Sequence, residues 1–231
     1  MNTVIACASI KPELERLKDN ASGLRVCYLP QNLHRTPGKL KELLQKNIDR
    51  LAKDGGRMVL GYGLCSNALV GLKAPEQGLY VPRAHDCITF FLGGRNLYKE
   101  AFARYPGTYY LTQSWIDNQK DPLGQVENEY TERVGRSMAE EAMETEIRNY
   151  RYIGYITPPG SETVGEHSAS PEEEDRYLKR AKENASFFGK ELMCHKGNDA
   201  MFRKILFGPY AGPDFIHIKP SESVKQSEFL K

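Results

Sequence analysis

Three cysteines stand at or just after the ends of apolar runs that are typical of buried strands. They are Cys7, Cys65 and Cys87. In an open parallel sheet, ligands bind outside the carboxyl ends of the strands, so thiols that are distant in the sequence can meet there. Thiolates are soft ligands suited to zinc and to iron–sulfur clusters. The placement therefore predicts a three-thiol metal site at a sheet edge, although the chain has no Cys-x-x-Cys pair.

Two different metal groups could be bound by the same three thiolates. Three protein ligands with one open position are the usual plan of a catalytic zinc site. Three thiolates can also hold a [4Fe-4S] cluster whose fourth iron stays open. The simpler alternative is that free cysteines pack as small apolar side chains. We expect that alternative for Cys27, which lies inside a strand, and for Cys194, although Cys194 could add a fourth ligand.

The residues next to Cys87 are the candidates for proton chemistry. His85 adds an imidazole two residues before the thiol, and Asp86 stands between them. We expect His85 to carry protons or orient a ligand, with direct binding of the metal as the alternative. Asp86 is placed to cap a short helix over 88–92.

A second group of residues could bind a cofactor or substrate beside the thiols. Gly61 and Gly63 would let the backbone approach a bound group closely, and amides up to Asn67 could bind an anion. Arg83 could hold a carboxylate or a phosphate. The alternatives are an ordinary strand-to-helix turn for 61–67 and a surface ion pair for Arg83.

The elements that must position these residues alternate between strands and helices. Strands are expected near 3–9, 24–28, 58–65, 79–86, 109–112, 152–156, 191–194 and 215–218. A helix from Thr36 to Ala52 has one apolar stripe, with Thr36 as its cap. Other helices are expected at about 126–149, at about 200–207, and from a capping box at Ser170 to about 188. The last ten residues are polar and are expected to fray.

This order predicts an α/β fold with a mostly parallel, Rossmann-like sheet flanked by helices, in one domain or two lobes. Residues 1–108 are expected to form an N-terminal α/β lobe that carries the cysteine site. Residues 109–231 are expected to form a C-terminal α/β portion, either a separate lobe or part of the same domain.

Composition limits the class of protein. The net charge of the 231 residues is +2, which provides no electrostatic reason to expect a nucleic-acid partner. No run of 18 apolar residues predicts a membrane span, and the start of the chain has no secretion signal. Five cysteines form no disulfide pattern. We therefore expect a cytoplasmic protein with reduced thiols, for which metal binding or catalysis is the better default.

Several segments resemble domain-of-unknown-function family 1638. They are 60–69, 81–87 and 105–112, together with Cys7 and the Pro-Glu-Leu run at 12–14. The resemblance extends over about residues 3–220. It implies a cysteine-containing α/β protein whose relatives are often encoded near corrinoid-dependent methyltransferase systems, and it supplies no reaction. The positions that it carries over are Cys7, Cys65, His85, Asp86 and Cys87.

His85-x-Cys87 is also similar to the histidine-x-cysteine element of zinc enzymes that pass a methyl group from a corrinoid to a thiol. Those enzymes have a barrel fold, so the similarity is an analogy. We expect a metalloprotein, and in one interpretation a metal-dependent transferase, acting in thiol or methyl-group chemistry on a small molecule. Its partner would be a corrinoid protein or a methyltransferase, which could bring cobalamin.

Two other functions remain open. One is a [4Fe-4S] protein whose open iron serves sulfur chemistry or electron transfer. The other is a non-enzymatic carrier of metal or cobalamin, or an accessory factor of a methyltransferase.

Overall fold

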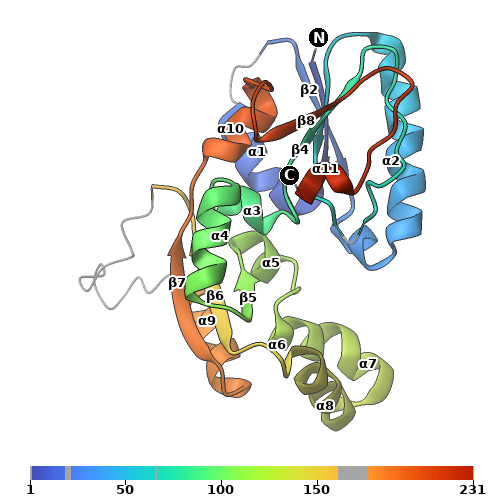
Figure 1. The fold of residues 1–231 in the computed structure, drawn as a ribbon. Helices are drawn as coiled ribbons and strands as arrows, with labels where there is room; N and C mark the ends of the chain where they lie inside the picture. Colours follow the sequence, from blue (N-terminus) through green and yellow to red (C-terminus); the bar gives the residue numbers. More distant parts are fainter. Residues whose placement is uncertain (1, 19–21, 66, 161–175, 231) are drawn as a thin grey trace. The chain divides into compact units, whose positions relative to one another are not determined.

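The chain divides into two compact units. The computed structural model describes residues 2–18, 22–65, 67–160 and 176–230. Unit 1 comprises Met1–Arg95 and Asp199–Lys231, and unit 2 comprises 96–198 (Figure 1). The expected boundary at residue 108 differs from this division. The physical reason is that the last strand returns to pair with a strand of unit 1, so both ends of the chain belong to that unit.

Unit 1 is built on a five-stranded sheet in the order β2-β1-β3-β4-β8. Its strands are β1 (Asn2–Cys7), β2 (Leu24–Leu29), β3 (Met58–Gly61), β4 (Leu79–Pro82) and β8 (Phe215–Ile218). The first four are parallel, and β8 runs antiparallel to β4 at the edge. The predicted α/β fold with a mostly parallel sheet is confirmed.

One face of this sheet packs against the helix α2 (Pro37–Leu51). The predicted apolar stripe is confirmed, and four of its residues are buried: Leu40, Leu44, Ile48 and Leu51. They join Ile5 and Leu60 in one core cluster, because alternate residues of a strand point to the same face. Thr36 occupies the N-cap position as expected, but its side chain makes no capping hydrogen bond. It ends the preceding turn, and its hydroxyl group donates to the Leu33 carbonyl at 3.4 Å.

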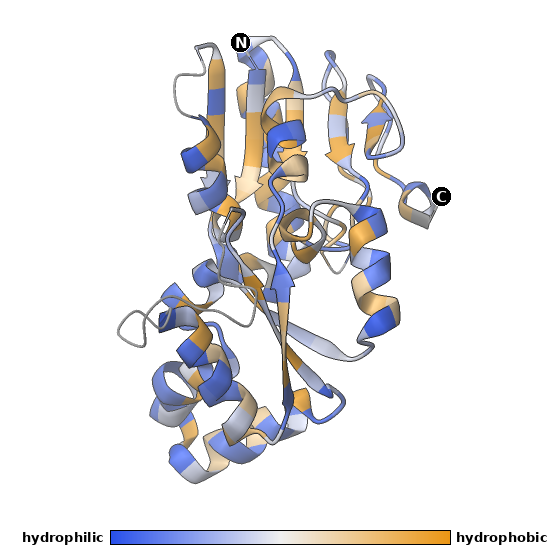
Figure 2. Ribbon diagram, turned by 90° about the vertical axis from the view of Figure 1, so that its left-hand side faces the viewer, coloured by the Kyte–Doolittle hydropathy of each residue, from blue (hydrophilic) through white to orange (hydrophobic). Residues whose placement is uncertain are grey.

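The opposite face is covered by α1 (Lys11–Lys18) and α10 (Ala200–Phe207), which pack against each other. The short helix α3 (Ile88–Phe91) also contacts α10, where the Phe91 and Phe202 rings meet edge to face at 5.1 Å. The hydropathy colouring in Figure 2 shows the strands of unit 1 as largely hydrophobic. Such strands are typical of a sheet that is covered on both faces.

Unit 2 contains a parallel sheet in the order β5-β6-β7. Its strands are β5 (Thr108–Leu111), β6 (Tyr152–Thr157) and β7 (Glu191–Lys196). The helices α5 (Gln113–Asp117) and α9 (Arg176–Phe187) contribute to a core cluster on one of its faces. The helix α4 (Arg95–Arg104), which precedes β5, is not predicted by the sequence pattern. The capping box expected at Ser170 lies outside the described residues.

The long helix expected over 126–149 is divided into pieces. Its region contains α6 (Pro122–Gln125), a π-helical turn (Val126–Tyr130), α7 (Thr131–Val134) and α8 (Arg136–Ile147). Gly135 separates α7 from α8 with a φ of 81°, which a helix cannot accommodate. The charged pattern therefore predicted correctly that this region is helical, but it was wrong in predicting a single continuous helix.

The C-terminal residues are docked rather than frayed. Val224 and Phe229 are buried in the core cluster of unit 1, and α11 (Ser227–Leu230) ends the described chain. The Val224 carbonyl accepts the Gly71 amide at 2.8 Å. Two apolar side chains thus outweigh the polar composition of this segment. None of the described helices is both long and apolar enough to cross a bilayer.

Docking of the C-terminal segment predicts that Phe229→Ala lowers the free energy of unfolding by about 3–5 kcal/mol. The matched control is Phe207→Ala, because Phe207 lies in the same unit but is 51% exposed. That control should change stability by less than about 0.5 kcal/mol. Chemical denaturation of both variants measures the difference, and equal small effects would contradict the docked arrangement.

Candidate functional site

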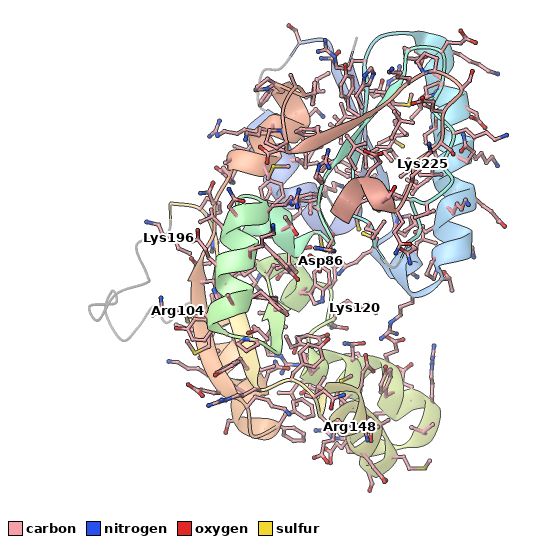
Figure 3. The ribbon with its side chains drawn as sticks, in the orientation of Figure 1. Asp86, Arg104, Lys120, Arg148, Lys196 and Lys225 are labelled. Carbon is pink, nitrogen blue, oxygen red and sulfur yellow. The ribbon has the colours of Figure 1, made fainter. Side chains whose placement is uncertain are left out.

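The three predicted thiols follow strands that end at the same edge of the unit 1 sheet. Cys7 is the last residue of β1, Cys65 follows β3, and Cys87 precedes α3 after β4. Figure 3 labels Asp86, which lies between the end of β4 and the start of α3. The carboxyl end of a parallel sheet is where ligands bind in this class of fold.

The segments that carry Cys65 and Cys87 are hydrogen-bonded to each other. The Leu64 amide donates to the Ala84 carbonyl at 2.8 Å, and the Cys65 amide donates to the His85 carbonyl at 3.0 Å. Gly63 lies directly against Asp86: a Cβ atom at Gly63 would stand 2.6 Å from the Asp86 nitrogen. This contact requires glycine, because no side chain fits at that distance.

Gly61 and Gly63 were expected to let the backbone approach a bound group closely. In the structure they instead let two parts of the protein's own chain approach each other. A Cβ atom at Gly61 would stand 2.7 Å from the Ala6 Cβ atom on β1. The two glycines thus bring strands and segments together around the site, which explains them without a bound group. Binding of a cofactor by Gly61 and Gly63 stays a prediction.

Cys65 has a backbone conformation that is rare for its residue type. Its φ is 45°, and Asn67 has a φ of 66°. The left-handed region is unfavourable for residues with a Cβ atom, although asparagine tolerates it. Such residues cluster at functional sites and persist only where the surroundings hold them. The conformation of Cys65 is stabilised by the hydrogen bond that its amide donates to the His85 carbonyl. The Asn67 side chain is exposed.

The three thiols lie close enough to act on one another. Burial raises the pKa of Cys65 to about 12, and Cys7 and Asp86 add to the effect. Burial raises the pKa of Cys87 well above its usual range, and Asp86, Cys7 and Cys65 raise it further. The tertiary structure thus brings Cys7, Cys65, Cys87 and Asp86 into one neighbourhood, where the thiols are protonated at neutral pH.

Two hydroxyl groups that sequence reasoning missed lie beside Cys7. Burial raises the pKa of Cys7, whereas the hydroxyl and amide of Ser9 and the hydroxyl of Tyr62 lower it. Ser9 is fully buried and Tyr62 is 3% exposed. Burial and the neighbouring thiols also raise the pKa of Tyr62, so it is a neutral phenol. The register that pairs Ala6 with Gly61 places it next to Cys7.

Asp86 caps α3, as predicted. Its Oδ1 atom accepts the amides of Ile88 at 3.0 Å and Thr89 at 3.4 Å. Burial raises the pKa of this carboxyl group, and the two amides and His85 partly offset that rise. His85 therefore lies near the carboxyl group, while its own side chain is exposed to solvent.

Arg83 has a contact within the protein where an anion was expected. Its Nη1 atom donates to the Glu228 carbonyl in α11 at 2.6 Å, so the guanidinium group ties the C-terminal helix to the end of β4. Its Nε atom is buried and has no hydrogen-bond partner in the described part of the chain. Anion binding by Arg83 stays a prediction.

The remaining two cysteines have different surroundings. Cys27 is half-buried on β2, and its thiol donates to the Asn47 Oδ1 atom at 3.8 Å. It also contributes to the raised pKa of Tyr62, so it borders the site rather than lying apart from it. Cys194 is exposed on β7 of unit 2.

As they stand, these side chains do not form a metal-binding group. Within residues 2–18, 22–65, 67–160 and 176–230, no three His, Cys, Asp or Glu side chains are arranged so that they could hold an ion. The arrangement instead places three protonated thiols, a half-buried carboxyl group and a phenol together. The cysteine side chain has one χ1 angle with three staggered rotamers, so a change of rotamer would change the distances between the sulfur atoms.

Comparison with known proteins agrees with the resemblance noted in the sequence. A family model described as a protein of unknown function, DUF1638, matches residues 28–206. The match includes Cys65, His85, Asp86 and Cys87, leaves Cys7 outside, and is narrower than the expected 3–220. No match was found among curated proteins or among solved structures.

The contact between Gly63 and Asp86 predicts that Gly63→Ala destabilises the fold. The added Cβ atom would meet backbone atoms of Asp86 at 2.6–2.9 Å, so the two segments would have to separate. We expect a loss of about 1–3 kcal/mol in the free energy of unfolding. Gly38→Ala is the matched control, because a Cβ atom at this helical glycine meets nothing within 4 Å. It should be neutral or stabilising, and a neutral Gly63→Ala would argue against the contact.

The cap on α3 predicts different effects for two substitutions of Asp86. Asp86→Ala removes the acceptor of the Ile88 and Thr89 amides and should cost about 1 kcal/mol of unfolding free energy. Asp86→Asn keeps a capping side chain and should cost little. Urea denaturation at neutral pH compares the two, and equal losses would mean that the carboxylate charge, not the cap, is what matters.

Proposed function

Because the chain belongs to DUF1638, a family of proteins of unknown function, its activity has to be inferred from its own residues, and we propose that it is a thiolate metalloprotein. In this proposal Cys7, Cys65 and Cys87 hold a soft metal cation, with zinc as the first candidate. The observation that carries it is that three thiols from three separate segments follow strands that end at the same edge of the unit 1 sheet.

The charges of the site favour a cation. Cys7 and Asp86 raise the pKa values of both Cys65 and Cys87, so each additional negative charge is unfavourable. Metal binding displaces thiol protons, and a coordinated thiol is deprotonated outright. A cation would thus relieve the repulsion that the thiolates would otherwise experience. The side chains would have to rotate toward a common point, since their present arrangement is not a metal-binding group.

A metal-free nucleophile is the less favourable alternative. Thiolates, not thiols, are nucleophilic, and reactive cysteines have lowered pKa values. Here burial raises the pKa of Cys65 to about 12 and raises those of Cys7 and Cys87 as well. Without a cation, the three groups would be almost entirely neutral at pH 7.

The chemistry that fits this site is the transfer of a methyl group to, or other reaction of, a small thiol. When bound, zinc would supply the positive charge that keeps a substrate thiol ionised at neutral pH. Exposed His85 would move a proton between solvent and the site, and Asp86 would orient the start of α3 beside Cys87. A corrinoid protein or methyltransferase of the reducing cytoplasm is the proposed partner.

The proposal predicts that Cys65→Ser and Cys87→Ser each lose most of the metal bound by anaerobically purified protein. Elemental analysis measures metal per chain, and circular dichroism checks folding. Cys194→Ser is the matched control, because this cysteine is exposed on unit 2 and should leave metal content unchanged. His85→Ala should also keep its metal, and turnover rather than metal content would then fall.

Three outcomes are informative. Zinc in the wild type that is lost in both site variants supports the proposal. Bound iron together with visible absorption would favour the [4Fe-4S] alternative over zinc, because zinc is colourless. Wild-type metal content in folded Cys65→Ser and Cys87→Ser would refute the thiolate site.

A further inference from the structure

The helices α1 and α10 of unit 1 meet through charged side chains as well as apolar ones. They pack against each other on one face of the sheet (Figure 1), and Leu14 of α1 and Phe202 of α10 are fully buried. Asp199 precedes α10 and is the first residue of unit 1 after the chain returns from unit 2. The contact between the two helices therefore also holds the point at which the chain re-enters unit 1.

Arg16 joins the two helices through an ion pair. Its Nη2 atom on α1 lies 2.5 Å from the Asp199 Oδ1 atom at the start of α10. Arg203 of α10 lies 3.8 Å from the other oxygen of the same carboxylate. Asp199 thus has two cationic neighbours, and its pair with Arg16 is a contact between the helices.

A second carboxyl group lies within reach of the same guanidinium group. Glu13 precedes Arg16 by three residues on α1, so their side chains share one face of the helix. The Glu13 Oε2 atom is buried, and both Arg16 and Asp199 act on this carboxyl group. Two carboxyl groups from two helices are therefore placed around one arginine.

The proton on Glu13 determines whether the two carboxyl groups compete. Burial is the main reason why the pKa of Glu13 is raised to about 7. Its own backbone amide and Arg16 lower the pKa, and Asp199 raises it. The charged groups that face Glu13 thus come from both helices, with Arg203 beyond Asp199. Glu13 is about half protonated at neutral pH, so a small change of pH alters its charge.

We propose that Glu13, Arg16 and Asp199 form a pH-sensitive clamp between α1 and α10. When Glu13 is protonated, Arg16 pairs with Asp199 and holds the helices together. When Glu13 loses its proton, two carboxylates repel each other and compete for one guanidinium group, and the clamp loosens. The clamp does not depend on the proposed metal site, because none of its three residues belongs to that site.

The pH dependence of unfolding tests the clamp in the full chain. A carboxyl group whose pKa is raised by folding stabilises the protein fully below its ordinary pKa of 4.5, and this stability is lost as the pH rises to about 7. Relative to Glu13→Gln, the unfolding equilibrium constant of the wild type should therefore rise about 10-fold or more between about pH 5.5 and pH 8. The matched control is Glu42→Gln, because Glu42 is exposed on α2. It should follow the wild type at every pH.

A second variant tests the competition itself. Asp199→Asn keeps a capping side chain but removes one of the two carboxylates, so Arg16 becomes free to pair with ionised Glu13. The loss of stability should then end at a lower pH than in the wild type. An unchanged pH range in Asp199→Asn would overturn the competition for Arg16.

Hydrogen–deuterium exchange locates the effect. Comparing the wild type with Glu13→Gln at the same pH cancels the pH dependence of the exchange chemistry. At about pH 8, amides of 11–18 and 200–207 should exchange faster in the wild type, whereas those of 37–51 should not differ. Equal exchange of α1 and α10 in the two proteins at this pH, or a wild-type pH profile of unfolding in Glu13→Gln, would overturn the clamp.

Discussion

The site depends on the contact between the backbone segments 63–65 and 84–86. Gly63 lies so close to Asp86 that only glycine fits. Two hydrogen bonds from backbone amides, those of Leu64 and Cys65, also join the two segments. One segment carries Cys65 in a left-handed conformation, and the other leads into Cys87. Because the same bonds hold both segments, the positions of the two thiols cannot vary independently.

Burial then determines the chemical state of the groups collected there. Cys65, Cys87 and Asp86 all have raised pKa values, and burial is the first cause for each. A buried set of acids is stable in its neutral form, or in an ionised form that a cation compensates.

The C-terminal segment supports the same edge of unit 1 from outside the family match. Residues near Val224 are hydrogen-bonded to the segment 71–73, which follows Cys65 in the chain. The contacts are the Gly71 amide to the Val224 carbonyl and the antiparallel bridge between Lys73 and Ser223. Arg83, just before the second thiol segment, donates to the Glu228 carbonyl. Both segments that build the site are thus held on their far sides by the last part of the chain.

The sequence by itself determined the local elements and the thiol positions. Periodicity predicted the strands and the helix 37–51, and strand ends placed Cys7, Cys65 and Cys87, because both signals lie within short windows. Tertiary structure decided what depends on pairing between distant segments. It assigned β8 to unit 1, buried Phe229, and placed Tyr62 beside Cys7 through a strand register that no local pattern contains. Gly135 shows the limit of the charged pattern, which predicts a helix but not the positive φ at which that helix is divided.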